Sequence, residues 1–475
     1  MKRNYWVTFL LISLLLLVPL VSSSLYQYSF AFQNGEEASI VLGQENFTAV
    51  GGGGNQSGLF GPEGITMDSK GDLWISDSEN NRVVEFTPPF LIGESASLVL
   101  GQENFSSYNC GNPTLNNLCD PQGIAFDSSG NLYVADNSNN RVLEFKPPFS
   151  DGEAASVSIG TNQNTTTPSN LDSPVGIALD ASNNLWVADE GNQRVLEFKG
   201  PISTNESASL ALGQTNFVSN SSGTNQSGFD TPDYVAFDHS GNLWVTDSSY
   251  RRILEFTTPF TTGENASLVI GQPNFNSTLN GPAQSLLSSP AGTTFDASGN
   301  LWVTDTFNGR VLEFPAPFTS GENASLVIGV PGFNSNVSTP SQSQLSGPEG
   351  IVFDSSGNLW VLDSAASRIL EFAQSGAVSS ASTPTSLLST TSSLSTSSAS
   401  SSVFNGPSSS SFSLITTQSS SLASAQTSAS ASKSASALAG SYFLVLLAVL
   451  IISFTVSIPV IRKKFQEKKN GNRTL

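Results

Sequence analysis

The residues that could do chemistry gather at one kind of position in this sequence. Six segments each open on a proline, and the residue after that proline varies while its neighbours stay constant: Glu63, Gln122, Val175, Asp233, Ala291 and Glu349. Three of these are carboxylic acids, whose oxygens are the ligands that Ca²⁺ and other hard divalent cations prefer. Glu63, Asp233 and Glu349 are therefore candidates for a cation site.

Aromatic and basic residues accompany these acids in two of the six segments. Tyr234, Tyr250 and Arg251 belong to the fourth segment, and Phe307 belongs to the fifth. Carboxylates, aromatic rings and an arginine around one opening could hold a sugar, a peptide or a cation. The alternative is ordinary surface variation on a constant scaffold.

The sequence contains few residue combinations of the kind that form catalytic sites. The only histidine, His239, falls in a tight turn that we expect on the face opposite to the variable residues. Neither a Ser-His-Asp triad nor a histidine-held metal is indicated. The surviving enzyme hypothesis is a site with one divalent ion held by Glu63, Asp233 and Glu349.

The six segments are copies of one repeat, and the repeat decides the architecture. In the fourth copy, short strands are expected at 234–238, 242–247, 252–256 and 266–271. Four such antiparallel strands make one propeller blade. The turn between the first two strands recurs at spacings of 59, 53, 58, 58 and 58 residues, beginning at Asp68, Asp127, Asp180, Asp238, Asp296 and Asp354.

The ring is expected to close with a strand from the N-terminal side. Ala-Ser opens the fourth strand at residues 38, 96, 155, 208, 266 and 324, so the first copy precedes every blade and the last blade lacks one. Residues 38–43 should pair with residues 368–372, which hides an exposed edge. The expected fold class is all-β, a six-bladed propeller over residues 36–372; a linear solenoid would leave the first strand unpaired.

Residues that recur in all copies are best explained by the fold. We expect each second-strand Asp to pair with the Arg five residues later, each Trp to pack between blades, and each third-strand Glu to meet a partner across the strands. The sets are Asp77, Asp136, Asp189, Asp247, Asp305 and Asp363; Arg82, Arg141, Arg194, Arg252, Arg310 and Arg368; Trp74, Tyr133, Trp186, Trp244, Trp302 and Trp360; and Glu85, Glu144, Glu197, Glu255, Glu313 and Glu371.

The repeat resembles the NHL repeat. The pattern Pro-x-Gly-Ile-x-Phe-Asp-x-x-Gly-Asn-Leu-Trp-Val-x-Asp, followed by Arg-Val-Leu-Glu-Phe, is nearly complete over residues 121–145, and the six copies cover most of residues 61–372. The departures are Tyr234 in place of Gly, Thr293 in place of Ile, and a loop without the usual Asn pair at 363–368. The resemblance implies a six-bladed propeller that binds proteins, RNA or glycans. Similar propellers serve as metal-dependent lyases and lactonases, but the amidating lyases need several histidines.

The regions flanking the propeller predict export and anchoring. Residues 1–24 have the charge and apolar core of a signal peptide. Residues 373–438 are almost entirely Ser, Thr and Ala, as expected of a disordered stalk. Residues 439–461 are apolar enough to cross a bilayer, and the basic tail 462–475 should stay cytoplasmic.

Cysteine and asparagine usage agrees with an extracellular location. Cys110 and Cys119 are the only cysteines, and in an oxidising compartment they should form a disulfide. Eleven Asn-x-Ser/Thr sites fall in linkers and around fourth strands, where glycosylation is sterically possible: Asn46, Asn55, Asn104, Asn164, Asn205, Asn220, Asn225, Asn265, Asn276, Asn323 and Asn336.

The net charge of the chain argues against one class of function. The formal net charge of −19 argues against nucleic-acid binding, which needs a basic face. The sequence predicts a membrane-anchored extracellular propeller that binds a protein or glycan, in adhesion or recognition, through the face that carries the linkers. It predicts no obligatory cofactor, although a divalent cation is possible. The alternatives are a divalent-metal-dependent lyase or lactonase and a passive structural envelope protein.

Overall fold

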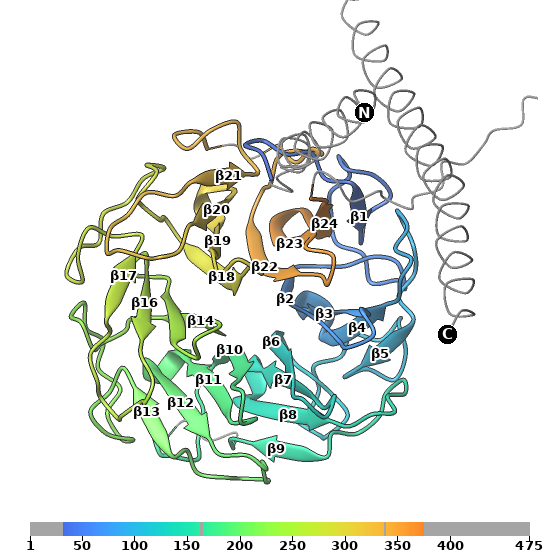
Figure 1. The fold of residues 1–475 in the computed structure, drawn as a ribbon. Coiled ribbons are helices and arrows are strands. Elements are labelled where there is room, and N and C mark those ends of the chain that lie inside the picture. Colours follow the sequence, from blue (N-terminus) through green and yellow to red (C-terminus); the bar gives the residue numbers. More distant parts are fainter. Residues whose placement is uncertain (1–31, 162–164, 337–338, 375–475) are drawn as a thin grey trace, which may run out of the picture. The chain divides into compact units, whose positions relative to one another are not determined.

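The computed structural model describes residues 32–161, 165–336 and 339–374, which form six four-stranded antiparallel sheets around one axis (Figure 1). This confirms the all-β, six-bladed propeller. The predicted signal peptide, membrane span and basic tail lie outside the described residues, as does the stalk beyond Gln374. Within the described ranges no helix is long and apolar enough to span a membrane.

Each blade runs outward from the axis in chain order. The first strands lie nearest the axis: β2 (Pro62–Met67), β6 (Pro121–Phe126), β10 (Pro174–Leu179), β14 (Pro232–Phe237), β18 (Pro290–Phe295) and β22 (Pro348–Phe353). The second strands are β3 (Leu73–Asp77), β7 (Leu132–Asp136), β11 (Leu185–Asp189), β15 (Leu243–Asp247), β19 (Leu301–Asp305) and β23 (Leu359–Asp363).

The outer half of each blade carries the third and fourth strands. The third strands are β4 (Arg82–Phe86), β8 (Arg141–Phe145), β12 (Arg194–Phe198), β16 (Arg252–Phe256), β20 (Arg310–Phe314) and β24 (Arg368–Phe372). The fourth strands are β5 (Leu98–Leu100), β9 (Val157–Ile159), β13 (Leu210–Leu212), β17 (Leu268–Ile270), β21 (Leu326–Ile328) and β1 (Ile40–Leu42). Single 3₁₀ turns join second to third strands at η1 (Ser78–Asn80), η2 (Asn137–Asn139), η3 (Glu190–Asn192), η4 (Thr306–Asn308) and η5 (Ser364–Ala366).

The hairpin between the first two strands is fixed by its aspartate. In blade one, Asp68 Oδ1 accepts the backbone N–H groups of Lys70 and Asp72 at 2.8 and 3.0 Å. Gly71 occupies the left-handed region at φ 86°, which glycine adopts without a steric cost. These turns lie at the end of the blade opposite to the 3₁₀ turns, and the end they mark is called the turn face below.

Each second strand ends on a buried ion pair. In blade one, Arg82 Nε lies 2.7 Å from Asp77 Oδ2, and both side chains are almost fully buried. The other carboxylate oxygen accepts the N–H of Phe60, and the guanidinium donates to the carbonyls of Gly58 and Phe105. The predicted Asp–Arg pairing is confirmed in all six blades, at 2.6–2.8 Å.

Aromatic rings fill the contacts between neighbouring blades. Trp74 of blade one packs edge-on against Phe126 and Phe149 of blade two, with centroids 5.7 and 4.9 Å away. Trp186, Trp244, Trp302 and Trp360 make equivalent contacts, so the packing role predicted for tryptophan is confirmed. The third-strand glutamates accept a hydrogen bond from the serine that precedes the fourth strand, as in Ser97 to Glu85 at 2.6 Å.

The closing strand is confirmed. β1 pairs antiparallel with β24 and completes blade six, with Ile40 opposite Glu371 and Leu42 opposite Ile369. The closure begins earlier than residue 36, because Phe32 is buried and packs 5.2 Å from Trp302. Phe32 thus occupies the place that Phe90 and Phe149 take at other blade junctions.

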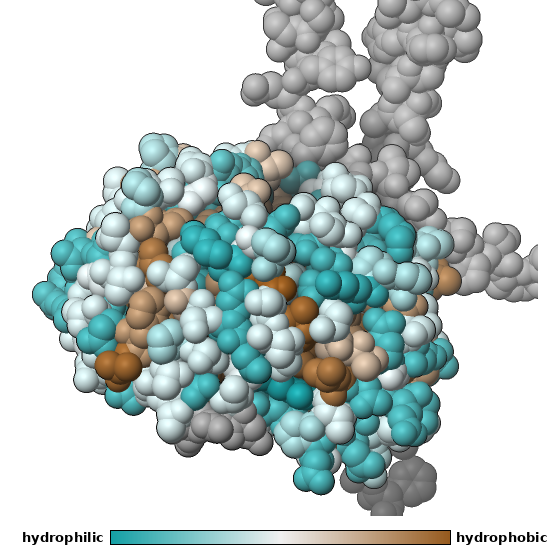
Figure 2. Space-filling model, turned by 90° about the horizontal axis from the view of Figure 1, so that it is seen from below, coloured by the Kyte–Doolittle hydropathy of each residue, from teal (hydrophilic) through white to brown (hydrophobic). Residues whose placement is uncertain are grey.

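The surface and the covalent features fit the sequence predictions. Cys110 and Cys119 form a disulfide, with Cα atoms 4.6 Å apart. Asn164 is outside the described residues, and the other ten sequon asparagines are exposed, which leaves their glycosylation a prediction. On the side shown in Figure 2, hydrophobic residues form small separate groups among hydrophilic ones.

We expect Asp189→Ala to destabilise the propeller by about 3–5 kcal/mol, because the buried Arg194 guanidinium would lose its counter-ion. Guanidinium chloride unfolding monitored by tryptophan fluorescence would measure the change. Glu37→Ala, at an exposed position before β1, is the control and should stay within about 0.5 kcal/mol of the parent. Equal stability of the two variants would contradict the role assigned to the ion pair.

Candidate functional site

The variable residues after the six prolines meet where the first strands begin. A bulge interrupts each first strand there: Pro62 pairs with Asp77, but Ile65 pairs with Ile75, so one extra residue is accommodated. Glu63 and its counterparts lie within this bulge. The bulge re-aims these side chains toward the axis, and the 3₁₀ turns lie at the same end of the blades.

Glycine after the variable residue allows neighbouring blades to touch. A Cβ atom on Gly64 would lie 2.2 Å from the carbonyl oxygen of Gln122 in blade two, and one on Gly292 would lie 2.3 Å from that of Glu349. Such distances forbid a side chain unless the blades separate. Gly123, Gly176 and Gly350 meet the next blade in the same way.

Tyr234 is the exception to this glycine rule. It belongs to blade four, yet its hydroxyl donates a 2.6 Å hydrogen bond to the carbonyl oxygen of Glu63 in blade one. Blades one and four stand on opposite sides of the ring (Figure 1), so the tyrosine side chain crosses the axis. The sequence marked Tyr234 as a departure from the repeat but did not show where it reaches.

Three carboxyl groups surround this tyrosine, and burial raises their pKa values. Burial raises the pKa of Glu63 to about 8, with Asp233, Asp120 and Glu79 adding repulsion. Burial, then Glu190, raises the pKa of Asp233 to about 7, against a hydrogen bond from Ser248. Glu63, Asp233, Tyr234 and Glu349 are called the axial cluster below.

Glu349 and Tyr234 share this environment. Burial raises the pKa of Glu349 well above its usual range, and the charges of Glu63 and Asp233 add to the effect. The pKa of Tyr234 is also raised well above its usual range, first by burial and then by Glu63, Glu349 and Asp233. All four residues remain partly exposed, so solvent reaches them. The structure thus brings together the three acids that the sequence singled out.

The surroundings of the axial cluster are acidic. Glu79, Asp120 and Glu190 act electrostatically on its members, and Asp172 acts on Glu190. The three lysines of the described residues, Lys70, Lys146 and Lys199, all lie at the turn face. No lysine of the described residues therefore lies beside the axial cluster, and its acidic groups attract cations.

The other predicted site residues make contacts of their own. Tyr250 packs over the Arg252 guanidinium at 5.3 Å, and Arg251 donates to the carbonyl of Thr278 at 3.4 Å. Phe307 is 79% exposed on η4, and Gln122 donates to Asp120 at 3.1 Å. Among the described residues no interaction joins Tyr250 or Arg251 to Tyr234, so the clustering of these three residues stays a prediction.

The carboxyl groups of the axial cluster are not arranged as a metal site. Among the described residues no three His, Cys, Asp or Glu side chains are placed to hold one ion. His239 is exposed in the turn after β14, at the turn face, as predicted. The carboxyl groups thus surround the tyrosine without forming a ready coordination shell, and the divalent-ion site predicted for Glu63, Asp233 and Glu349 is not preformed.

The repeat matches a known family description. The NHL repeat is found at residues 61–86, 118–145 and 171–198. A probable peptidyl-alpha-hydroxyglycine alpha-amidating lyase of Caenorhabditis elegans is 28% identical over 153 residues, which is 31% of this chain and 39% of that protein. Peptidyl-glycine alpha-amidating monooxygenase B of Xenopus laevis is 30% identical over 117 residues, 24% of this chain and 12% of that protein. The chain thus spans well under half the length of these curated relatives.

Solved structures are similar to this chain only at low sequence identity. Streptogramin B lyase aligns with a TM-score of 0.42 and 14% sequence identity, over 65% of this chain and 93% of the lyase chain. A catalytically inactive virginiamycin B lyase from Staphylococcus aureus, solved with quinupristin, has a TM-score of 0.42 at 14% identity, covering 70% and 97%. TM-scores this low give no information about the chemistry of this chain. The chain carries NHL repeats in a six-bladed propeller, and over part of its length it is similar to peptidyl-glycine alpha-amidating enzymes.

We expect the melting temperature to fall by a few degrees between pH 6 and pH 8.5. A carboxyl group whose pKa is higher in the folded than in the unfolded state stabilises the fold at low pH. This contribution is lost as the pH rises through the folded-state pKa, which is about 8 for Glu63. Calorimetric melts would record the trend. Glu63→Gln should flatten it and melt higher than the parent at pH 8.5, whereas Glu37→Gln should not. A parent melting temperature that rises over this range would count against the assignment.

Proposed function

We propose that the propeller is a recognition module whose axial cluster binds a ligand through a positively charged group. The observation that carries this proposal is the convergence of Glu63, Asp233 and Glu349 around the Tyr234 hydroxyl. Without a cation these acids repel one another and hold protons. An ammonium, a guanidinium or a metal ion would take the place of those protons and relieve the repulsion.

The tyrosine explains why the ligand would be held at one end of the ring. Because Tyr234 reaches from blade four to blade one, it lies across the axis and limits how far a ligand can enter. Its ring supplies an aromatic surface beside the acids, a combination that favours organic cations. Glu79, Asp120 and Glu190 would add long-range attraction, which speeds association and weakens with salt.

Outward display from a membrane remains part of the proposal. The disulfide between Cys110 and Cys119 and the exposed sequon asparagines support an extracellular location. A recognition module at a cell surface would serve adhesion or ligand capture. If the axial cluster binds no ligand, a passive structural role in the cell envelope is the remaining alternative.

A lyase activity is the second candidate, because curated relatives of this chain are named as peptidyl-alpha-hydroxyglycine alpha-amidating lyases. The pKa of about 8 would let Glu63 exchange a proton near neutral pH, which suits a general acid or base. The sequence holds one histidine, and it lies at the turn face, so a histidine-held metal does not fit this chain. Any such reaction would depend on the carboxyl groups and Tyr234.

The binding proposal is tested by calorimetric titration of the full-length protein with spermidine, a lysine-rich peptide and CaCl₂ at pH 8.5. At least one probe should bind, more weakly at pH 6 and at higher salt. Glu349→Gln should lower its affinity about tenfold or more, while Glu37→Gln should leave it unchanged. Silence with all three probes, or equal binding by both variants, would reject the proposal.

The lyase candidate is tested with a peptidyl-alpha-hydroxyglycine substrate and chromatographic detection of the peptide amide. If the reaction occurs at the axial cluster, Glu63→Gln should lower kcat at least about a hundredfold, in line with the loss of a general acid or base. Absence of peptide amide with the parent protein, across pH 6–9 and with added divalent metals, would remove this candidate and leave the binding proposal standing.

A further inference from the structure

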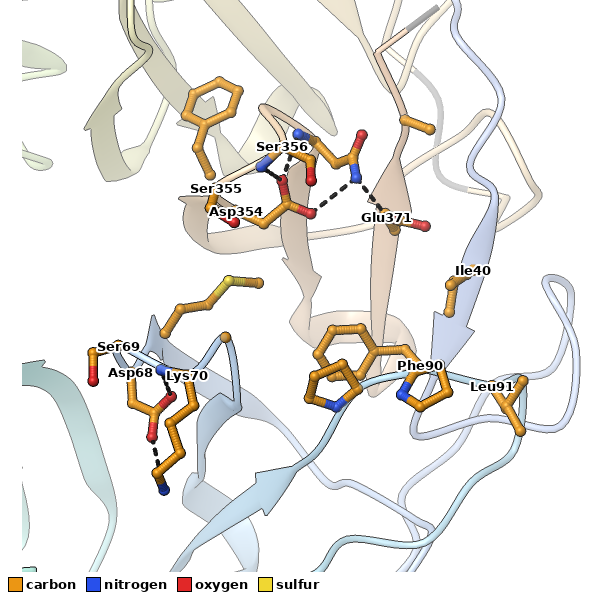
Figure 3. Close-up of a pocket in the computed structure, with 17 residues that line it drawn as sticks. Ile40, Asp68, Ser69, Lys70, Phe90, Leu91, Asp354, Ser355, Ser356 and Glu371 are labelled. Atoms are coloured by element: carbon orange, nitrogen blue, oxygen red, sulfur yellow. Dashed lines mark hydrogen bonds and ion pairs between the residues drawn. The ribbon is translucent and has the colours of Figure 1, made fainter. Parts of the chain in front are cut away.

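A cavity of about 690 Å³ opens at the turn face between blades six and one. It is unrelated to the axial cluster, which lies at the other end of the strands. Its walls come from three segments that are distant in sequence: the hairpin turn of blade one, the hairpin turn of blade six, and the connection that follows β4. Figure 3 shows these as the groups around Asp68, Asp354 and Phe90.

The residue that ends the first strand differs at this seam from most other blades. The last residue of the first strand is aromatic or leucine in five blades and methionine in blade one: Phe126, Leu179, Phe237, Phe295, Phe353 and Met67. At this same seam Phe90, which lines the cavity, keeps its contact with Trp360, with ring centroids 4.7 Å apart. Met67 lines the cavity at the position equivalent to that of Phe126, which packs against Trp74 at the next junction.

The walls have two chemical characters. Pro88, Pro89, Phe90 and Leu91 make an apolar side, and Leu91 is 56% exposed. The facing hairpin turns present the hydroxyls of Ser69, Ser355 and Ser356 (Figure 3). No protein hydrogen-bond partner is recorded for these three hydroxyls within the part of the chain that the structure describes.

Carboxylates hold the hydroxyl side in place. Asp354 Oδ1 accepts the backbone N–H groups of Ser356 and Asn358 at 2.8 and 2.9 Å, which fixes the turn. Asp68 fixes the turn of blade one in the same way. With Glu371 and one lysine, Lys70, the lining carries three acids against one base, so it disfavours phosphate and other anions.

We propose that this seam cavity binds a neutral saccharide. A pyranose ring presents an apolar C–H face and a rim of hydroxyls, and it would pack the first against Phe90 and the prolines while the rim meets the serines and carboxylates. A purely apolar ligand would leave the hydroxyls of Ser355 and Ser356 without partners. The volume lies within the range of small-ligand pockets.

The test begins with full-length protein on an array of neutral oligosaccharides, including maltotriose, mannotriose and N-acetylchitotriose, followed by calorimetric titration of each sugar retained. At least one should bind. Met67→Phe restores the residue type of other blades and fills the cavity, so it should lower affinity at least tenfold without lowering the melting temperature.

Three further variants separate this site from others. Ser355→Ala combined with Ser356→Ala should lower affinity about tenfold through two lost hydrogen bonds. Ser240→Ala, at the same turn position in blade four, and Glu349→Gln, in the axial cluster, should not change it. The proposal is overturned if no sugar binds, if the filled Met67→Phe variant binds as well as the parent, or if Glu349→Gln abolishes binding.

Discussion

The buried Asp–Arg pair of each blade is the interaction on which the rest of the propeller depends. The aspartate uses one oxygen for the arginine and the other for the backbone of the incoming linker, as Asp189 does for Arg194 and Asp172. The arginine then donates to carbonyls of the linkers on both sides, as Arg194 does to Asn170 and Phe217. Linkers that have no strand partners thereby gain fixed polar contacts, and they in turn place the first strands and the residues of the axial cluster.

Much of this architecture could be predicted because six copies of the repeat can be compared within one chain. Constant Asp, Arg, Trp and Glu positions proved structural, and the missing fourth strand of blade six was supplied by residues 40–42. Glu63, Asp233 and Glu349 were singled out because they vary at a fixed position. Ring closure brings Glu63 of blade one beside Glu349 of blade six, and Asp233 acts on both from blade four.

The remaining features depend on distances that no repeat pattern contains. That Tyr234 reaches Glu63 depends on the width of the closed ring, although the change from Gly to Tyr was visible in the sequence. The seam cavity depends on the summed volumes of side chains from two blades, so Met67 alone did not reveal it. The contacts of Arg251 with Thr278 and of Tyr250 with Arg252 likewise depend on loop geometry that the repeat pattern does not contain.

Closure by β1 has a consequence for the order in which the protein folds. Ser39 bonds Glu371 across 332 positions of the sequence, whereas the contacts within blades one to five are local. Joining segments this distant costs chain entropy before any contact compensates for it, which slows folding. During synthesis, the first five blades have all four strands before Phe372 has been added to the chain. β1 is made first, but it stays unpaired until β24 has been made. The last step of folding is therefore the one that seals the ring, and it requires nearly the whole propeller sequence.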